Sequence, residues 1–246
     1  MLAALVTGAG AVLLLVELAV LPPQAAGVAG VTAAQGAMLA TALAWARAGS
    51  AASVVAVALV GVAAAAASLG ALGSCEYLGP ALWVGLLSAR GRLTGLGLGT
   101  PVAPWRVAAG GLIGVGLSAH LLLSASRTLG VHVRSDHTPE MLVAIAYDVG
   151  ANVLAAECFF RGALFSRGER RWSFAAAATV ATIAYVLRYL VDPLLPKSAG
   201  LMVGAVFYLA LLGGVNCWLL SWSGSLLPGL VSATIFFAAY RTLGAQ

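Results

Sequence analysis

Apolar runs separated by short polar breaks follow one another along almost the whole chain. Each run is close to the roughly 20 residues that a helix needs to cross the hydrocarbon core of a bilayer. The breaks hold a Pro-Pro pair, a Gly-rich stretch and clusters of arginine, which are typical of helix ends. The pattern predicts an all-α, polytopic transmembrane bundle of about eight spans, at residues 2–21, 25–46, 51–72, 107–124, 140–165, 173–191, 199–220 and 225–242.

Residues 76–89 decide the topology, because they fit either an interfacial helix or the short second arm of a tight hairpin. If they do not cross, the two sides of the membrane carry six and five basic residues, and the bias is too small to orient the chain. If they cross, seven arginines share one side and four basic residues remain on the other. We favour this second arrangement, with the larger group in the cytoplasm: Arg47, Arg90, Arg92, Arg106, Arg167, Arg170 and Arg171.

Composition supports a membrane protein with little or no soluble part. Hydrophobic residues make up 61% of the 246 and charged residues only 9%, too few polar groups to cover a soluble domain of this size. The formal charge of +5 lies mainly between the apolar runs, where arginine anchors loops, so no nucleic acid partner is expected. No long linker is present, and we expect one integral domain over residues 1–246. The Arg-rich and Ala-rich composition favours a bacterial inner membrane.

Cysteine and glycine add two further expectations. Cys75, Cys158 and Cys217 are scattered without metal-ligand spacing, so we expect no metal, no cofactor and no disulfide framework. Gly110 with Gly114, and likewise Gly200 with Gly204, have the spacing that lets helices approach closely, within one chain or between two copies.

The span at residues 140–165 holds polar groups that are costly in hydrocarbon. Asp148, Asn152, Glu157 and Arg161 all lie in it, and one charged side chain at mid-membrane costs roughly 2.5 to 3.5 kcal/mol. Glu157 and Arg161 are four residues apart, the spacing of a helical ion pair. Because Asp148 and Glu157 point to opposite faces of a regular helix, at least one polar face should meet the protein interior.

Other spans carry isolated polar residues. We interpret Asn216 and Ser232 as groups that form hydrogen bonds between helices. His120 lies in an apolar run, which favours a neutral ring with a local partner. Glu17 stands alone in the first span.

The sequence AAECFFRGALF, residues 155–165, resembles the first motif of the CPBP family of intramembrane endopeptidases, which includes the CAAX prenyl proteases. That motif is Glu-Glu-x-x-x-Arg followed by Gly, and Glu157, Arg161 and Gly162 match it. Ala156 stands where the family has its first Glu. The resemblance implies that Glu157 and Arg161 are the retained catalytic-site positions.

Two later blocks fit the same family frame. ATIAYVLRYL places Tyr185 on the Phe and Tyr189 on the His of the second motif, Phe-x-x-x-His. GSLLPGLVSATIFF places Ser232 on the His and Phe236 on the Asn of the third motif, His-x-x-x-Asn. The resemblance covers residues 100–243, which leaves residues 1–100 as additional N-terminal helices.

The replaced positions change the expected function. In the family, the first Glu and the histidines are thought to activate a water that attacks a peptide bond, with the Asn and a His assisting at the oxyanion. Ala156 and Phe236 can neither activate a water nor assist at the oxyanion, and Tyr189, as a tyrosine, is a poor base at neutral pH. We therefore expect a degenerate homologue that binds a membrane-embedded protein or peptide segment in a pocket lined by Asn152, Ala156, Glu157, Arg161, Tyr185, Tyr189, Ser232 and Phe236.

Two alternatives stay open. The protein could be an active endopeptidase with an altered site, in which Glu157 is the base and His120 its partner. It could instead be a small transporter or channel subunit, with Glu17, Asp148 and Arg161 lining a path through the membrane.

Overall fold

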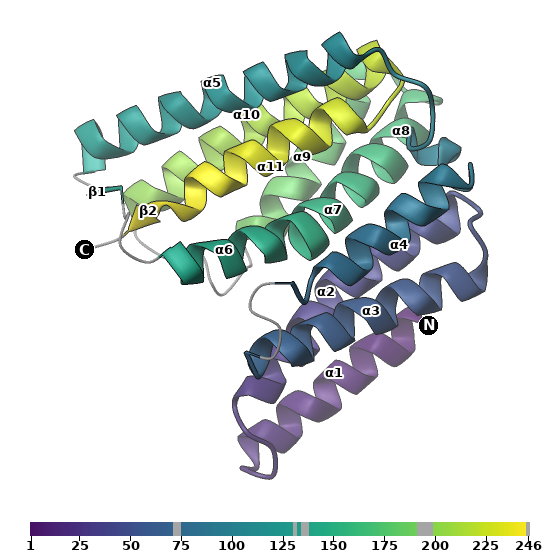
Figure 1. Ribbon diagram of the computed structural model, residues 1–246, viewed down its shortest axis with the longest axis vertical. Helices are drawn as coiled ribbons and strands as arrows, with labels where there is room; N and C mark the ends of the chain where they lie inside the picture. Colours follow the sequence, from purple (N-terminus) through teal and green to yellow (C-terminus); the bar gives the residue numbers. More distant parts are fainter. Residues whose placement is uncertain (71–74, 130–131, 134–137, 191–198, 245–246) are drawn as a thin grey trace.

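The computed structural model describes residues 1–70, 75–129, 132–133, 138–190 and 199–244. The helices lie side by side and the chain runs back and forth between two ends of the bundle (Figure 1). Two short strands, β1 (His132–Val133) and β2 (Leu243–Gly244), pair antiparallel at one end. The helices are α1 (Leu2–Glu17), α2 (Gln24–Trp45), α3 (Ser50–Ser68), α4 (Leu78–Ala89), the short η1 (Thr94–Leu96), α5 (Pro104–Leu129), α6 (Thr138–Tyr147), η2 (Asp148–Asn152), α7 (Val153–Ala156), η3 (Glu157–Phe165), α8 (Ser166–Glu169), α9 (Phe174–Leu190), α10 (Ala199–Ser223) and α11 (Leu227–Arg241).

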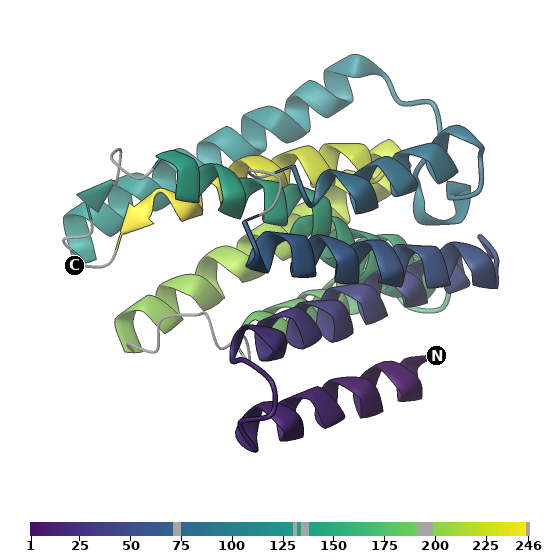
Figure 2. The ribbon, with the colours of Figure 1, turned by 60° about the horizontal axis from the view of Figure 1, so that its bottom comes forward.

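The predicted polytopic helical fold is confirmed. Five helical stretches of the described chain are long and apolar enough to cross a membrane. The shorter apolar helices α1, α4, α9 and α11 run beside them (Figures 1 and 2), which is consistent with the prediction of about eight spans and gives nine if the short α4 also crosses. The protein is an integral membrane protein. The five long stretches are Gln24–Trp45, Ser50–Ser68, Pro104–Arg127, Met141–Glu169 and Met202–Ser223.

Residues Leu78–Ala89 form helix α4, which packs beside α3. It has 12 residues, a length of about 18 Å at 1.5 Å per residue. The indole nitrogen of Trp83 donates a hydrogen bond to the carbonyl oxygen of Ala52 at 3.1 Å, which fixes the two helices together. The segment is thus the short second arm of a hairpin, and the chain that follows it returns to the end of the bundle where α2 finishes.

The glycines of α5 bring this helix onto α11. A Cβ atom on Gly114 would lie 2.8 Å from the carbonyl oxygen of Ser232, and one on Gly110 would overlap the backbone of Pro228. The first predicted glycine pair therefore serves a close approach within one chain. A Cβ atom on Gly204, from the other pair, would meet nothing within 4 Å.

The continuous helical stretch from α6 to α8 lies at the centre of the bundle. Its α7 and η3 segments contact α2, α9, α10 and α11, and it is the most buried of the five candidate spans. Because other helices surround it, its polar residues face protein rather than lipid, as their cost in hydrocarbon requires.

Candidate functional site

The central helix departs from regular α geometry at its polar residues. Asp148–Asn152 and Glu157–Phe165 are π-helical, a widened form that occurs often at functional sites. Small residues allow neighbouring segments to come close: a Cβ on Gly150 would overlap the backbone of Tyr77, and one on Gly162 would lie 3.1 Å from the Cβ of Leu96. The site helix is therefore held tightly against the start of α4 and against η1.

Glu157 and Arg161 form an ion pair in the protein interior. Their atoms Oε1 and Nη1 are 3.6 Å apart, and neither residue is exposed. The guanidinium carbon of Arg161 lies 3.8 Å from the ring centre of Tyr185, close enough for a cation–π interaction. A Cβ on Gly213 would lie 2.9 Å from Arg161 Nη2, so α10 leaves just enough room for this side chain.

The ion pair belongs to a larger polar centre, which comprises Glu157, Arg161, Thr182 and Asn216. Asn216 donates a hydrogen bond from Nδ2 to the carbonyl oxygen of Gly229 at 3.1 Å, and Glu157 Oε2 lies 3.5 Å from the Cβ position of the same glycine. Among the described residues, both Glu157 oxygens, all three Arg161 nitrogens, Thr182 Oγ1 and Asn216 Oδ1 have no hydrogen-bond partner. Buried polar atoms nearly always have a hydrogen-bond partner. The atoms of this centre are exceptions, so they can still donate or accept hydrogen bonds.

A second polar network occupies the same interior, nearer the C-terminal end of α11. Asp148 accepts two hydrogen bonds from Arg241, from Nε at 2.8 Å and from Nη2 at 3.0 Å. Asn152 donates to Asp148 Oδ1 at 2.8 Å and accepts from the hydroxyl of Tyr189 at 3.2 Å. The rings of Tyr189 and Tyr185 are 4.9 Å apart, so the two tyrosines connect this network to the polar centre.

The structure encloses the residues of the predicted pocket in one interior. All eight are buried: Asn152, Ala156, Glu157, Arg161, Tyr185, Tyr189, Ser232 and Phe236. They divide between the polar centre, the Asp148 network and an aromatic cluster. In that cluster the ring of Phe236 lies 5.6 Å from Phe237 and 6.1 Å from Tyr208. The hydroxyl of Ser232 has no hydrogen-bond partner among the described residues, so the expected bond between helices is not formed there, whereas Asn216 forms one.

Two residues of the polar interior, Arg241 and Gln35, are not predicted from the sequence. In the sequence, Arg241 stands at the end of a span, and only the need of buried Asp148 for a cation indicates its role. Gln35 is buried in the middle of α2 and donates a hydrogen bond to the hydroxyl of Tyr147 at 2.9 Å. A glutamine inside an apolar run is the feature that could have revealed it.

His120 and Glu17 occupy other surroundings. The Nδ1 atom of His120 lies 2.7 Å from the hydroxyl of Tyr208, so the ring has the predicted local partner, on α10. Glu17 is exposed at the end of α1, and Asp148 is bound to Arg241. The described contacts thus place none of His120, Glu17 and Asp148 beside Glu157. In the described chain, no three His, Cys, Asp or Glu side chains come together as a metal would require.

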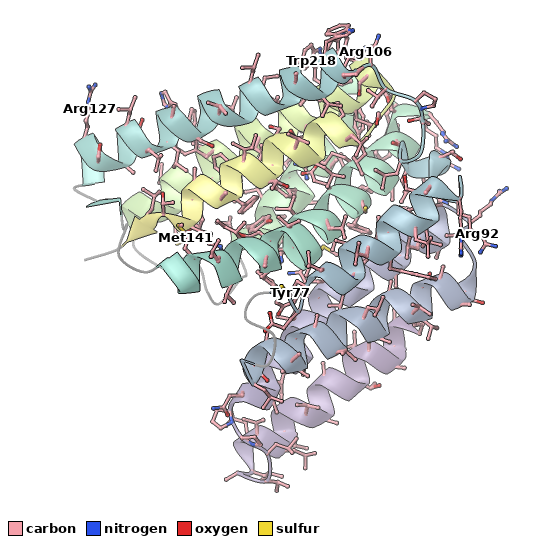
Figure 3. The ribbon with its side chains drawn as sticks, viewed as in Figure 1. Tyr77, Arg92, Arg106, Arg127, Met141 and Trp218 are labelled. Atoms are coloured by element: carbon pink, nitrogen blue, oxygen red, sulfur yellow. The ribbon has the colours of Figure 1, made fainter. Side chains whose placement is uncertain are left out.

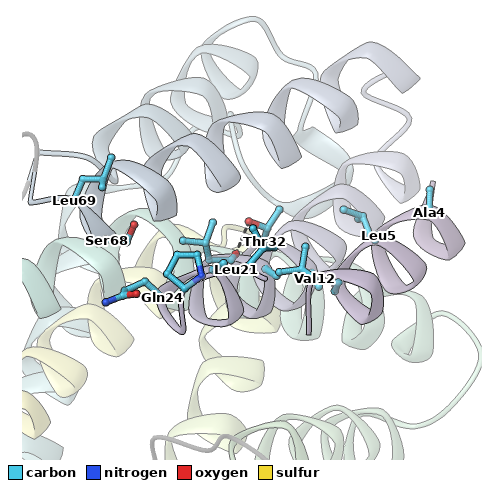
Figure 4. A pocket seen from close by; sticks show the side chains of 15 residues that line it. Ala4, Leu5, Val12, Leu21, Gln24, Thr32, Ser68 and Leu69 are labelled. Atoms are coloured by element: carbon cyan, nitrogen blue, oxygen red, sulfur yellow. Dashed lines mark hydrogen bonds between the residues drawn. The ribbon is translucent and has the colours of Figure 1, made fainter. Parts of the chain in front are cut away.

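A groove of about 690 Å³ lies apart from this site, between α1, α2 and the end of α3 (Figure 4). Apolar side chains such as Leu5, Val12 and Leu21 line most of it. Its Thr32 hydroxyl is already bound to the carbonyl oxygen of Val28 at 2.7 Å. The groove offers apolar contact but no group suited to acid–base chemistry.

Comparison with known proteins identifies the part of the chain that carries this site. Residues 138–238 match the family described as type II CAAX prenyl endopeptidase Rce1-like. The match runs from α6 into α11 and contains all three motif blocks, so the predicted resemblance is confirmed, and this segment is Rce1-like. No curated protein and no solved structure matches the chain.

Proposed function

We propose that this Rce1-like protein resides in a bacterial inner membrane and binds a membrane-embedded segment of another protein without cleaving it. One observation carries the proposal. Glu157, the acidic residue retained from the first motif, has no exposed surface and pairs with Arg161 at 3.6 Å. A carboxylate held in this way is poorly placed to take a proton from water.

The surroundings of the replaced positions support a loss of catalysis. Amide hydrolysis needs a base for the attacking water and donors for the developing oxyanion. Ala156 offers only a methyl group, the hydroxyl of Tyr189 is bound to Asn152, and Phe236 packs among aromatic rings. Of the positions that the resemblance aligns with catalytic groups, Ala156 and Phe236 thus serve packing and Tyr189 an internal hydrogen bond, while the hydroxyl of Ser232 forms no hydrogen bond among the described residues.

The polar centre supports binding as the remaining activity. Family membership implies a substrate that lies in the membrane, and the scaffold keeps the buried helix that carries Glu157 and Arg161. The oxygens and nitrogens of this centre that form no hydrogen bond among the described residues could bind the backbone of a kinked helix or a polar side chain once the helices that cover them move apart, and such bonds hold helices together in lipid.

The first test measures cleavage. The purified protein in liposomes should not hydrolyse a prenylated CAAX peptide or a transmembrane peptide, and Glu157→Gln should change nothing. If the wild-type protein cleaves either peptide and Glu157→Gln abolishes this cleavage, the proposal is wrong and the endopeptidase alternative is correct.

The second test measures binding in cells. A photoreactive amino acid replaces Leu187, which is 56% exposed on α9, or Leu13, which is 49% exposed on α1. We expect the Leu187 position to give an adduct with a discrete, full-length membrane protein, and the Leu13 position to give none. Adducts that contain only fragments, or equal adducts at both positions, would contradict uncleaved binding at the Rce1-like core.

A further inference from the structure

One end of the bundle is strongly basic. Arginines gather where α2, α4 and α8 end and where α5 begins, and Figure 3 shows Arg92 and Arg106 at this end with Arg127 at the other. Glu169 is the one acidic residue of the described chain at this end, and it accepts a hydrogen bond from Ser221 at 2.7 Å. The positive charge of this surface is therefore almost uncompensated.

Three of these arginines surround the C-terminal end of α2, and we call Arg47, Arg92 and Arg167 the arginine cluster. Arg92 Nη1 lies 3.5 Å from the carbonyl oxygen of Ala48, and Arg167 Nη2 lies 3.5 Å from that of Trp45. The carbonyl of Trp45 is the last of α2, and the last carbonyls of a helix lack partners and carry partial negative charge, which explains the position of Arg167.

The cluster is held in place but keeps donors to spare. The guanidinium carbon of Arg167 stacks 4.3 Å from the ring centre of Trp45, which limits its freedom. Each guanidinium has five N–H donors, and the contacts to the carbonyls of Ala48 and Trp45 use one from Arg92 and one from Arg167. All three arginine side chains are exposed.

The end of a span and a group of tryptophans lie beside this surface. The span α2 ends at Trp45, two residues before Arg47. Trp105, Trp172 and Trp218 are 59%, 51% and 47% exposed at the same end, and tryptophan is enriched at membrane–water interfaces. Phosphate groups of lipids are thus the nearest anions to the cluster.

We propose that the arginine cluster is a binding site for the phosphate of anionic phospholipids in the leaflet that faces this end. Guanidinium groups form paired, charge-assisted hydrogen bonds with phosphate oxygens. Three of them around one helix end, with no carboxylate among them, give a site that prefers an anionic headgroup over a zwitterionic one.

The test compares lipid selectivity in phosphatidylcholine vesicles that contain spin-labelled phosphatidylglycerol or spin-labelled phosphatidylcholine. The wild-type protein should prefer phosphatidylglycerol. Replacing all three arginines with glutamine should lower this preference by roughly fivefold per arginine, on the order of a hundredfold at the site. Replacing them with lysine should retain much of it, which separates lost charge from misfolding.

The matched control is Arg127→Gln, an exposed arginine at the opposite end (Figure 3), which should leave the preference unchanged. Inorganic phosphate should not displace the labelled lipid at the ionic strength of the assay, since the apolar tails anchor the headgroup. An unchanged preference in the triple glutamine variant would overturn the proposal. So would an equal fall in the Arg127 variant, which would indicate attraction by overall charge alone.

Discussion

Glu157 and Arg161 depend on each other because neither has access to water. Removing one charge from a buried pair leaves the other uncompensated, at a cost of roughly 3 to 5 kcal/mol. We therefore expect Arg161→Gln to lower the free energy of unfolding by about that amount, as measured by reversible unfolding in mixed micelles. Arg127→Gln, at an exposed position, should change it little.

The double variant Glu157→Gln with Arg161→Gln separates the interaction from the individual side chains. With both charges removed, no uncompensated buried charge remains. The loss in the free energy of unfolding should therefore be clearly smaller than the sum of the losses in the two single variants. Additive losses would mean that the two groups do not interact in the folded protein.

At the scale of the secondary-structure element, the ion pair between Asp148 and Arg241 holds the end of α11 against η2. Arg241 keeps a side chain that is 27% exposed, whereas Asp148 is almost fully buried. Asp148→Asn should cost about 1.5 to 3 kcal/mol through the lost charge-assisted hydrogen bonds, and amide hydrogen exchange at the end of α11 should rise. Unchanged exchange there would show that the pair does not hold the helix.

The contact between α5 and α11 depends on the lack of a side chain at Gly114. Gly114→Ala places a Cβ 2.8 Å from the carbonyl oxygen of Ser232, so the helices must separate, at a cost of about 1 to 3 kcal/mol. Gly116→Ala, in the same helix with nothing within 4 Å, is the matched control and should have little effect. Thermal unfolding in detergent measures both, and equal effects would contradict this role for Gly114.

The positions of the helices are well predicted from the sequence, but their contacts are not. Span limits follow from hydropathy and bilayer thickness, so the predicted span at residues 25–46 lies within one residue of α2, Gln24–Trp45. A helix in lipid is apolar on its outer face as well as its inner one, so the pattern does not show which residues meet. The bond from Arg241 to Asp148 joins residues 93 positions apart, and no local spacing indicates it.

For the site, the sequence predicts one buried set of residues, and the structure places that set inside the bundle. The sequence does not predict how these residues divide between the polar centre, the Asp148 network and the aromatic cluster. Tyr189 bonds to Asn152 rather than to the Glu157 pair, and the central helix is π-helical at both Asn152 and Glu157. No residue type specifies such a turn in advance.

At the scale of the whole molecule, the charge at the two ends orients the protein. The arginine-rich end holds the N-terminus, and the last described element, β2, lies at the opposite end in both views (Figures 1 and 2). Because short loops rich in arginine stay in the cytoplasm, we expect a cytoplasmic N-terminus and an external C-terminus. A fluorescent protein fused before Met1 should fluoresce, and alkaline phosphatase fused after Gln246 should be active.

The same fusions also test the role of α4. If this short helix is the second arm of a hairpin, the chain crosses once more than it would without it, and the termini lie on opposite sides. If residues 76–89 stay at one surface, both termini face the same side and Arg47 is separated from Arg92 by the bilayer. Inactive phosphatase at Gln246 together with a fluorescent N-terminal fusion would thus rule out the gathering of arginines at one end, although Arg92 lies 3.5 Å from the carbonyl oxygen of Ala48, in the turn after α2.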